Sequence, residues 1–411
     1  MWPYYAVLAV LTCLALYECI DERKLYGHMA AATVATFAAL RYETGFDWMA
    51  YDAYFRASPG LLEYLAVGRD PHTMNMEIGY FGLNVLVRSF ANDVHALFFT
   101  ASIMTVVILH YVISKITTRT AIVWLVYFGL LFIAGQMTLV RQNIASCLVL
   151  LALFLSARGL IIAPPALIAA SATFHVSTLP LIPLPFFVRI FPPAALAVGV
   201  VASGVIVLAV GINVFSVTLN LLSKILPASM EATAVKMSYY ATVPHSTISY
   251  TYIAMALAHG GMLALLYLLS SREEREDPFV KIALWLLIGQ LGVQLFFHSS
   301  TDLWARAMLI TIPWAVATLT RLDWTRRRAP AVRIVATSVF AIFGAVVLTR
   351  VLLASEVSPL IPYHSILHVA LGEEGNGRER AIQSWLRDYP NEEHISQALA
   401  EYKRLGVYHG E

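Results

Sequence analysis

Charged residues are scarce in this sequence. Asp, Glu, Lys and Arg make up 13% of the 411 residues, whereas 59% of the residues are hydrophobic. A soluble domain carries roughly 25% charged residues, so the composition excludes a soluble globular protein and indicates a polytopic membrane protein. The formal net charge is +2, and no basic patch indicates nucleic acid as a partner.

Cysteines and cofactor motifs are also few. Cys13, Cys19 and Cys147 all lie within or at the ends of apolar runs, where cysteine behaves as a small hydrophobic residue; a disulfide framework and a zinc site are not indicated. The sequence has no Asp-x-Asp, no His-Glu-x-x-His and no glycine-rich phosphate loop. We therefore expect neither a metal ion nor a cofactor.

Long apolar runs dominate the sequence instead. A membrane-spanning helix needs about 20 apolar residues, and the candidate spans are 3–20, 26–40, 94–114, 119–138, 142–157, 162–187, 191–211, 249–270, 279–297, 303–320 and 331–352. The stretch 212–225 is either a further span or an interfacial helix, and 77–90 is short enough to predict a re-entrant or interfacial helix. We predict an all-α bundle of about 11–13 transmembrane helices, with the first run retained as a helix.

The positions of Lys and Arg predict the orientation, because these residues gather in cytoplasmic loops. They are concentrated in the loops at 21–24, 115–119, 158–159, 271–281 and 321–333. The loops at 41–93, 226–248 and 353–411 then lie outside. We divide the chain into a transmembrane domain, 1–353, and an extracytoplasmic helical tail, 354–411. In the tail, 372–378 predicts a flexible link and 379–405 predicts two short amphipathic helices.

The segment Arg41–Tyr51 follows an apolar run and carries Arg41, Glu43 and Asp47 among aromatic residues. Charge near a bilayer is expensive and usually functional, so the segment predicts a polar reaction site at the outer face. Glu43, Asp47 and Glu77 are candidate general bases, since burial beside aromatic residues raises the proton affinity of an acid. The alternatives are a salt bridge from Asp47 to Arg41 and a helix cap for Glu77.

Arg141 lies in a tight turn between two apolar runs, next to Gln142 and Asn143. It either reaches lipid headgroups or binds an anion at the start of the following helix. His175 lies within a predicted span and is followed by Pro180 and two further prolines. Its ring is either a hydrogen-bonded core group or part of a polar cavity beside a broken helix.

His298, Asp302 and Arg306 are spaced four residues apart. On a helix this spacing places all three side chains on one face. An Asp302–Arg306 ion pair, with Asp302 as a helix cap, is the structural interpretation. Arg306 lies deeper in the predicted span, so we expect it to face a cavity.

Taken in order, these residues resemble the EpsG/Wzy-like family of bacterial polysaccharide polymerases, over residues 1 to about 350. The motifs that carry the resemblance are Arg41-Tyr-x-x-Gly45-x-Asp47-x-x-x-Tyr51, Glu77-x-Gly79-Tyr80, Arg141-Gln142-x-x-Ala145, Phe174-His175 and Arg306. Position 46 departs from the pattern, because Phe46 is bulky where the family often has a small polar residue.

The resemblance implies a GT-C-like membrane glycosyltransferase that polymerises undecaprenyl-diphosphate-linked repeat units at the outer face of the bacterial inner membrane, without a metal. It implies three groups of site residues: Arg41, Arg141, Gln142 and Arg306 for the diphosphate; Asp47, Glu77 and His175 for catalysis; Trp48, Tyr51 and Tyr80 for the sugar. The implied partners are the lipid-linked oligosaccharide and membrane lipid, with a chain-length regulator protein as an option. An O-antigen ligase and a lipid-linked oligosaccharide flippase are the alternatives.

Overall fold

The computed structural model describes two compact units, one made of Met1–Pro183 with Asp323–Glu411 and the other of Leu184–Leu322. Within these limits the described residues are 1–21, 23–68, 76–225, 250–298, 301–322, 330–353, 359–373, 375–388, 399–400 and 402–404. The two units are described separately below.

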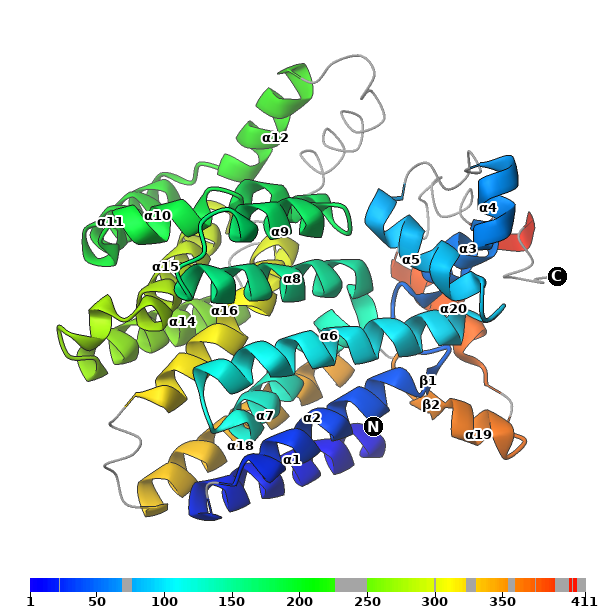
Figure 1. The fold of residues 1–411 in the computed structure, drawn as a ribbon, viewed down its shortest axis with the longest axis horizontal. Coiled ribbons are helices and arrows are strands. Elements are labelled where there is room, and N and C mark those ends of the chain that lie inside the picture. Colours follow the sequence, from blue (N-terminus) through cyan, green and yellow to red (C-terminus); the bar gives the residue numbers. More distant parts are fainter. Residues whose placement is uncertain are drawn as a thin grey trace. The chain divides into compact units, whose positions relative to one another are not determined.

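The bundle of the first unit includes α1 (Trp2–Asp21), α2 (Lys24–Ala39), α6 (Val94–Ile116), α7 (Thr120–Leu130), α8 (Val140–Ala157) and α18 (Pro330–Leu353). α1 packs against α2, α7 and α18, and α2 packs against α6 and α7. Figure 1 shows α18, from the far end of the sequence, beside α1 and α7. α7 and α18 approach closely at two glycines, because a Cβ atom on Gly129 would lie 2.6 Å from the Cα atom of Gly344.

Seven of the described helices are long and apolar enough to cross a membrane. They are Trp2–Asp21, Val94–Ile116, Val140–Ala157, Tyr252–Leu269, Pro278–Phe296, Leu303–Arg321 and Ala331–Leu353. Several shorter apolar helices accompany them. The predicted all-α, polytopic helical bundle is confirmed, and the chain is a multi-pass membrane protein.

Two predicted spans are not single α-helices. The run 119–138 divides into α7 and a π-helix, η2 (Ile133–Thr138). The run 162–187 divides into α9 (Ala163–Ala172), the 3₁₀-helix η3 (Val176–Leu181) and α10 (Leu184–Ile190). Pro180 lies inside η3, in agreement with the expected helix break near the prolines. π-helices are rare and frequently lie at functional sites.

The loop between α2 and α6 is folded. It contains β1 (Arg41–Tyr42), α3 (Trp48–Ala57), α4 (Leu61–Val67) and α5 (Ile78–Arg88). At 11 residues, α5 is too short to span a bilayer, as the sequence predicts. Aromatic and aliphatic side chains of α3, α5 and the start of α6 share one hydrophobic core.

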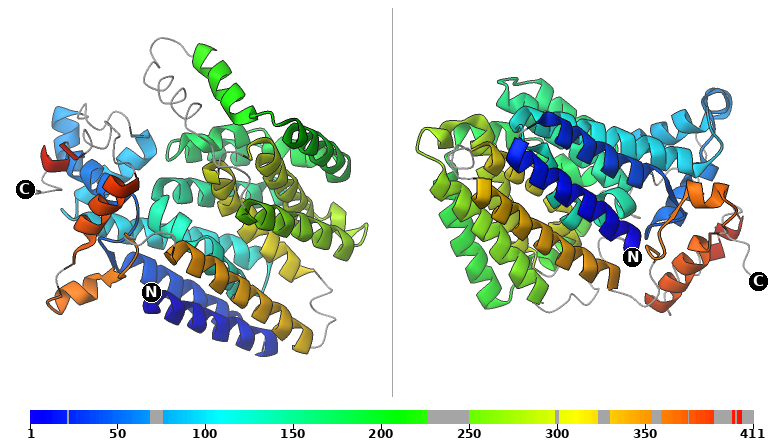
Figure 2. Two further views of the ribbon diagram at one scale, coloured as in Figure 1. Left: turned by 180° about the vertical axis from the view of Figure 1, so that it is seen from behind. Right: turned by 90° about the horizontal axis from the view of Figure 1, so that it is seen from below.

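The C-terminal segment joins that core. β2 (His364–Ser365) pairs antiparallel with β1, with Arg41 opposite Ser365 and Tyr42 opposite His364. α19 (Ile366–Ala370) and α20 (Gly377–Asp388) follow. Figure 1 and the left view of Figure 2 show α20 beside the helices of the α2–α6 loop.

The sequence predicts a flexible link at 372–378, and two glycines of this segment lie against the α2–α6 loop. Gly375 packs against the Tyr42 ring, and Gly377 lies against the Glu43 backbone. The absence of a side chain at both glycines permits this close approach. Of the predicted amphipathic helices in the tail, α20 is present, whereas most of the second falls on 389–398, 401 and 405, outside the described residues.

The second unit contains α10, α11 (Pro193–Val210), α12 (Val214–Ile225), α14 (Tyr250–Leu269), η5 (Glu274–Glu276), α15 (Pro278–Phe296) and α16 (Thr301–Arg321). α15 packs against α11, α14 and α16. Arg321 forms an ion pair with Asp277, whose side chain also caps the N-terminus of α15. The predicted outer loop 226–248 and the side chain of Asp302 lie outside the description.

Candidate functional site

The motif that runs from Arg41 to Tyr51 wraps around the end of the π-helix η2. Arg41 donates a hydrogen bond through Nη1 to the carbonyl oxygen of Gln136, and Tyr51 Oη donates to the carbonyl oxygen of Thr138 at 3.0 Å. The last carbonyl groups of a helix lack partners within it. These two side chains therefore supply donors at the end of η2.

Gly45 is required at the same junction. Its φ angle is +130°, and a Cβ atom there would collide with the carbonyl oxygen of Met137. Only glycine adopts such a conformation without strain. The motif spacing Arg41, Gly45 and Tyr51 thus has a structural basis, because all three residues contact the η2 end.

Arg41 is buried, with 1% of its surface exposed. Its guanidinium lies 4.2 Å from the centroid of the Phe98 ring and 3.4 Å from Met137 Sδ. Burial lowers the pKa of Arg41 to about 10, so the side chain stays protonated at neutral pH. A cation at a helix C-terminus is favoured by the helix dipole, and Arg41 holds the α2–α6 loop on the bundle.

A second glycine, Gly79, brings the Glu77-x-Gly79-Tyr80 motif next to the Phe174-His175 motif. The Gly79 amide donates to the carbonyl oxygen of Thr173 at 2.8 Å, and a Cβ atom on Gly79 would collide with the Thr173 side chain. The start of α5 therefore abuts the end of α9. This contact brings Glu77, just before α5, to His175, just after α9.

Arg141, Glu77 and His175 form one constellation. Arg141 Nη1 lies 2.5 Å from Glu77 Oε2, and His175 Nδ1 lies 3.1 Å from Glu77 Oε1. Their side chains are 27%, 19% and 16% exposed, respectively. The carboxylate thus bridges an arginine and a histidine, and all three groups keep some accessible surface.

Three tyrosine rings surround the Arg141 guanidinium. Its carbon lies 6.0 Å from the ring centroids of Tyr51 and Tyr54 and 5.8 Å from that of Tyr80. Tyr51 is 4% exposed and Tyr80 is 0% exposed. Aromatic faces attract a cation at this distance, so the rings hold Arg141 in place.

Glu77 occupies the N-cap position of α5, but its side chain makes no cap hydrogen bond. Burial opposes ionisation of the carboxyl group, whereas the hydrogen bond from His175 and the charge of Arg141 favour it. The two favourable effects together outweigh burial and lower the pKa of Glu77 to about 2. Glu77 is therefore an anion at neutral pH.

A known family matches most of the chain. A model of the EpsG family matches residues 24–365. The chain belongs to the EpsG family. This family comprises Wzy-like polysaccharide polymerases. No curated protein and no solved structure matches the chain.

Three more residues that the sequence predicts for the site are Gln142, Asp47 and Trp48. Gln142 follows Arg141 in the first turn of α8, is 6% exposed, and its Oε1 has no hydrogen-bond partner among the described residues. Asp47 precedes α3, and its carbonyl oxygen accepts from the Tyr51 amide at 3.1 Å. Trp48 is 1% exposed, with the Arg378 guanidinium 5.6 Å from its ring centroid.

Arg306 belongs to the second unit, on α16, and is half-buried there. The remaining motif residues all belong to the first unit. Convergence of Arg306 with Arg141 stays a prediction.

Sequence reasoning missed three residues of this region. Tyr54 is three residues after Tyr51 on α3, so helical periodicity could have identified it. The other two are Asp52, which is 2% exposed, and Arg378 of the C-terminal tail. Arg378 forms ion pairs with two acids of the loop, because its Nη2 lies 3.1 Å from Glu43 Oε1 and 3.8 Å from Asp52 Oδ2. No local pattern connects position 378 to positions 43 and 52.

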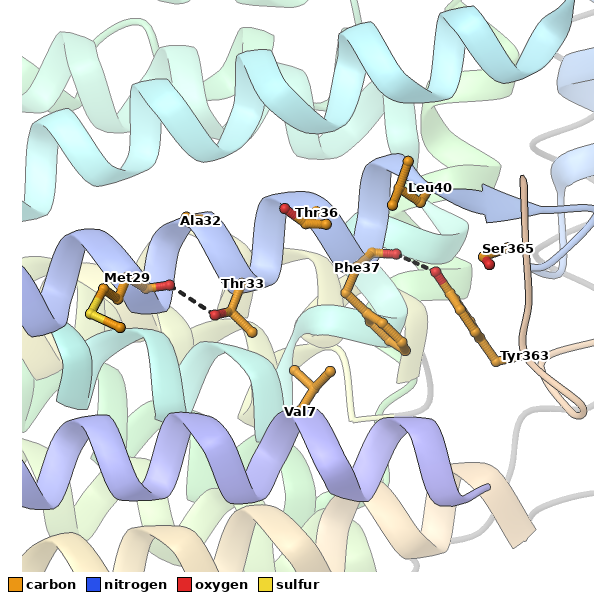
Figure 3. Close-up of a pocket in the computed structure, with 9 residues that line it drawn as sticks. All are labelled: Val7, Met29, Ala32, Thr33, Thr36, Phe37, Leu40, Tyr363 and Ser365. Carbon is orange, nitrogen blue, oxygen red and sulfur yellow. Dashed lines mark hydrogen bonds between the residues drawn. The ribbon is translucent and has the colours of Figure 1, made fainter. Parts of the chain in front are cut away.

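An apolar groove of about 590 Å³ lies elsewhere in the first unit, along α1, α2 and the β2 strand. Figure 3 shows Tyr363 donating to the carbonyl oxygen of Phe37 at one end of it. None of its lining residues is charged, so it offers no cationic contact for a diphosphate. Within the described part of the chain, no three His, Cys, Asp or Glu side chains gather as a potential metal site.

Proposed function

We propose that this EpsG-family chain is a membrane glycosyltransferase that polymerises oligosaccharide repeat units carried on undecaprenyl diphosphate. The reaction takes place at the outer face of a bacterial inner membrane and uses side-chain charge in place of a metal ion. The observation that carries the proposal is the Arg141–Glu77–His175 constellation, which unites residues of three separate sequence motifs within the region that matches the family.

The bond changes are those of a glycosyl transfer. A hydroxyl group of one lipid-linked unit attacks the anomeric carbon of the sugar carried by another. A new carbon–oxygen bond forms, and the bond from that carbon to the diphosphate oxygen breaks. The hydroxyl proton leaves to a base, and the lipid diphosphate departs with the electron pair.

His175 is the proposed base. Its Nδ1 faces Glu77 Oε1 at 3.1 Å, and the carboxylate selects the tautomer in which Nδ1 carries the proton. Nε2 is then the basic nitrogen, as in other carboxylate-oriented histidines. Glu77 itself has a pKa of about 2, which makes it a weak base and an effective orienting group.

Arg141 is the proposed contact for the departing diphosphate. A guanidinium has five N–H donors, and Glu77 uses one nitrogen of Arg141. The remaining donors suit phosphate oxygens, because the planar fork binds two of them at once. Gln142 at the α8 N-terminus and Arg306 are the proposed additional contacts, and Asp47 is a second proposed proton acceptor.

Tyr51, Tyr80 and Trp48 are the proposed sugar-facing aromatic residues. All three side chains are at most 4% exposed in this structure, so contact with a sugar requires these rings to become exposed. Arg41 supports the site by holding β1 and α3 on the end of η2.

Substitution of Arg141 tests the proposal. Arg141→Ala is expected to lower polymerisation by about 100-fold or more, since removal of one positioned donor to developing charge has that effect. Cells with the variant at normal membrane level should make glycans of a single repeat unit, and Arg141→Lys should restore only part of the chain length. Arg158→Ala, at an exposed position, is the matched control. Glycans of normal length from Arg141→Ala would contradict the proposal.

The acceptor and the metal requirement need separate measurements. Purified protein should extend lipid-linked units in the presence of a chelator. Transfer of glycan to lipid A core in place of a second repeat unit would indicate a ligase, and movement of the intact lipid-linked unit across vesicles would indicate a flippase.

A further inference from the structure

A polar pocket of about 310 Å³ lies on the α2–α6 loop, apart from the Arg141 constellation. Its lining residues include Asp52, Phe55, Arg56, Arg88, Asn92 and Asp93. We propose that this pocket binds a neutral sugar of the lipid-linked repeat unit, away from the reacting bond, and so selects the repeat unit that is polymerised. The inference rests on the proposed function, because it assigns a second subsite for the same substrate.

The charges of the pocket decide between classes of ligand. Two aspartates and two arginines line it, so their formal charges cancel. A diphosphate would meet the carboxylates of Asp52 and Asp93, and a cation would meet the two guanidinium groups. A sugar hydroxyl both donates and accepts hydrogen bonds, so a polyhydroxy compound can use both kinds of group without a charge conflict.

Asp52 is the buried acceptor of the pocket. The residue is 2% exposed, and its Oδ1 accepts from Arg56 Nε at 2.9 Å. Its Oδ2 has no hydrogen-bond partner among the described residues, and Arg378 Nη2 lies 3.8 Å away, beyond hydrogen-bond distance. A buried carboxylate oxygen without a donor is costly, and the charge of Arg378 offsets part of that cost. Asp52 therefore serves the pocket by holding Arg56, and the accessible polar groups of Arg56, Asn92 and Asp93 are the ones that a sugar hydroxyl can meet.

The arginines of the pocket are held in place. Arg88 Nη1 donates to the carbonyl oxygen of Phe55 at 2.9 Å, and its guanidinium lies 5.7 Å from the Phe55 ring centroid. Arg56 is anchored through Nε on Asp52, while its side chain is 42% exposed. Each guanidinium therefore keeps further N–H donors for a ligand.

The Asp93 side chain is also held in place, in this case by His95. Its Oδ1 accepts from the His95 amide at 3.0 Å and lies 2.7 Å from His95 Nδ1. These contacts cap the N-terminus of α6 and orient the second carboxylate of the pocket. The exposed Asn92 side chain beside it carries both a donor and an acceptor.

Helix α3 connects the pocket to the Arg141 constellation. Tyr51 and Tyr54 on this helix contact Arg141, whereas Asp52, Phe55 and Arg56 line the pocket. An α-helix with its side chains is about 10 Å across, so the two regions are separated by roughly one helix width. An oligosaccharide with its diphosphate at Arg141 can reach the pocket with a later sugar.

Binding of a lipid-free ligand tests the pocket directly. The probe is the repeat-unit oligosaccharide released by mild acid from the lipid-linked unit that accumulates in cells lacking this chain. Calorimetry with the full-length protein in nanodiscs should detect binding to the wild type. Asn92→Ala and Arg56→Ala should each weaken it about tenfold, as expected for the loss of one hydrogen bond to a charged or buried partner. Arg158→Ala should bind like the wild type.

The Asn92→Ala variant should also change the kinetics of polymerisation. Asn92→Ala should raise the half-saturating concentration of lipid-linked unit about tenfold with a nearly unchanged maximal rate, because the remote sugar is held equally before and during the reaction. Asn92 is exposed, so this variant is expected to fold.

Two results would overturn the pocket assignment. One is wild-type affinity in both Asn92→Ala and Arg56→Ala, and the other is no binding of the oligosaccharide to an actively polymerising wild type. Arg141→Ala separates this inference from the proposed function, since it should still bind the lipid-free oligosaccharide while failing to polymerise. If Arg141→Ala polymerises normally, the proposed function is wrong. Binding of the oligosaccharide to the pocket variants then still tests whether the pocket holds a sugar.

Discussion

Arg41 and Arg141 lie in the same unit, and both are near Tyr51. Their guanidinium groups nevertheless differ in burial and in the groups that they contact. Arg41 is 1% exposed and contacts a backbone carbonyl, a thioether and the Phe98 ring. Arg141 has a 27% exposed side chain and contacts the Glu77 carboxylate within a ring of tyrosines. The buried arginine fastens a loop to a helix end, whereas the accessible one is the proposed contact for a substrate.

The difference shows why an unusual charge near a membrane is not by itself evidence of a binding site. Both arginines stand out equally in the sequence. Their roles separate only through their partners, because a cation that completes the hydrogen bonds of a helix end has less capacity left for a ligand. The following substitutions test the comparison, from the largest expected effect on stability to the smallest.

Arg41→Ala is expected to lower the free energy of unfolding by about 4 kcal/mol, because it leaves a cavity and an unpartnered carbonyl group on Gln136. Arg141→Ala should cost about 1–2 kcal/mol. Thermal unfolding in detergent, monitored by tryptophan fluorescence, measures both. Equal losses in the two variants would remove the distinction between a structural and a substrate-facing arginine.

The contribution of Glu77 to the free energy of unfolding depends on pH. Its pKa is lowered to about 2 from 4.5, so its ionised form stabilises the fold above pH 4.5, and this contribution is lost as the pH falls towards 2. A shift of this size corresponds to about 3 kcal/mol at neutral pH. The wild type should exceed Glu77→Gln in stability by that order at neutral pH, and the gap should close in acid.

Unfolding temperatures of wild type and Glu77→Gln, recorded from about pH 7 to about pH 3, measure this gap. A gap that stays constant across the range would show that the carboxylate does not gain stability from Arg141 and His175.

Gly79→Ala should cost about 2 kcal/mol, because a Cβ atom at this position collides with Thr173. Separation of α5 from α9 should also move Glu77 from His175 and reduce polymerisation. Gly82→Ala on the same helix is the matched control, since a Cβ atom there meets nothing within 4 Å. Gly82→Ala should be neutral or stabilising by up to about 1 kcal/mol. Similar behaviour of both variants would show that the α5–α9 junction does not position the site.

The sequence predicted most of the helices because hydrophobic runs of bilayer length are a strong signal. The run 331–352 became α18 at Pro330–Leu353, within two residues of the prediction. Exact ends inside 119–138 and 162–187 were not predictable, since these runs meet tertiary partners: Arg41 donates to the π-helix, and Gly79 donates to Thr173 between α9 and η3.

The residues of the site could be predicted from the sequence, whereas the contacts between them could not. Glu77, Arg141 and His175 were each identified as polar residues in apolar surroundings, but nothing in the local sequence indicated that Glu77 bridges the other two. The Arg378 ion pair with Glu43 joins positions 335 residues apart, and a pairing of this range is set by the fold, not by a motif.

The β1–β2 pair also constrains the order of biosynthesis. Ser365, the strand partner of Arg41, is synthesised after the seven long apolar helices found among the described residues. The loop that carries Tyr51 and Asp52 therefore remains without its strand partner while the helices that follow it are made and inserted. A contact between such distant residues forms slowly, so the α2–α6 loop is completed only after these helices are in place.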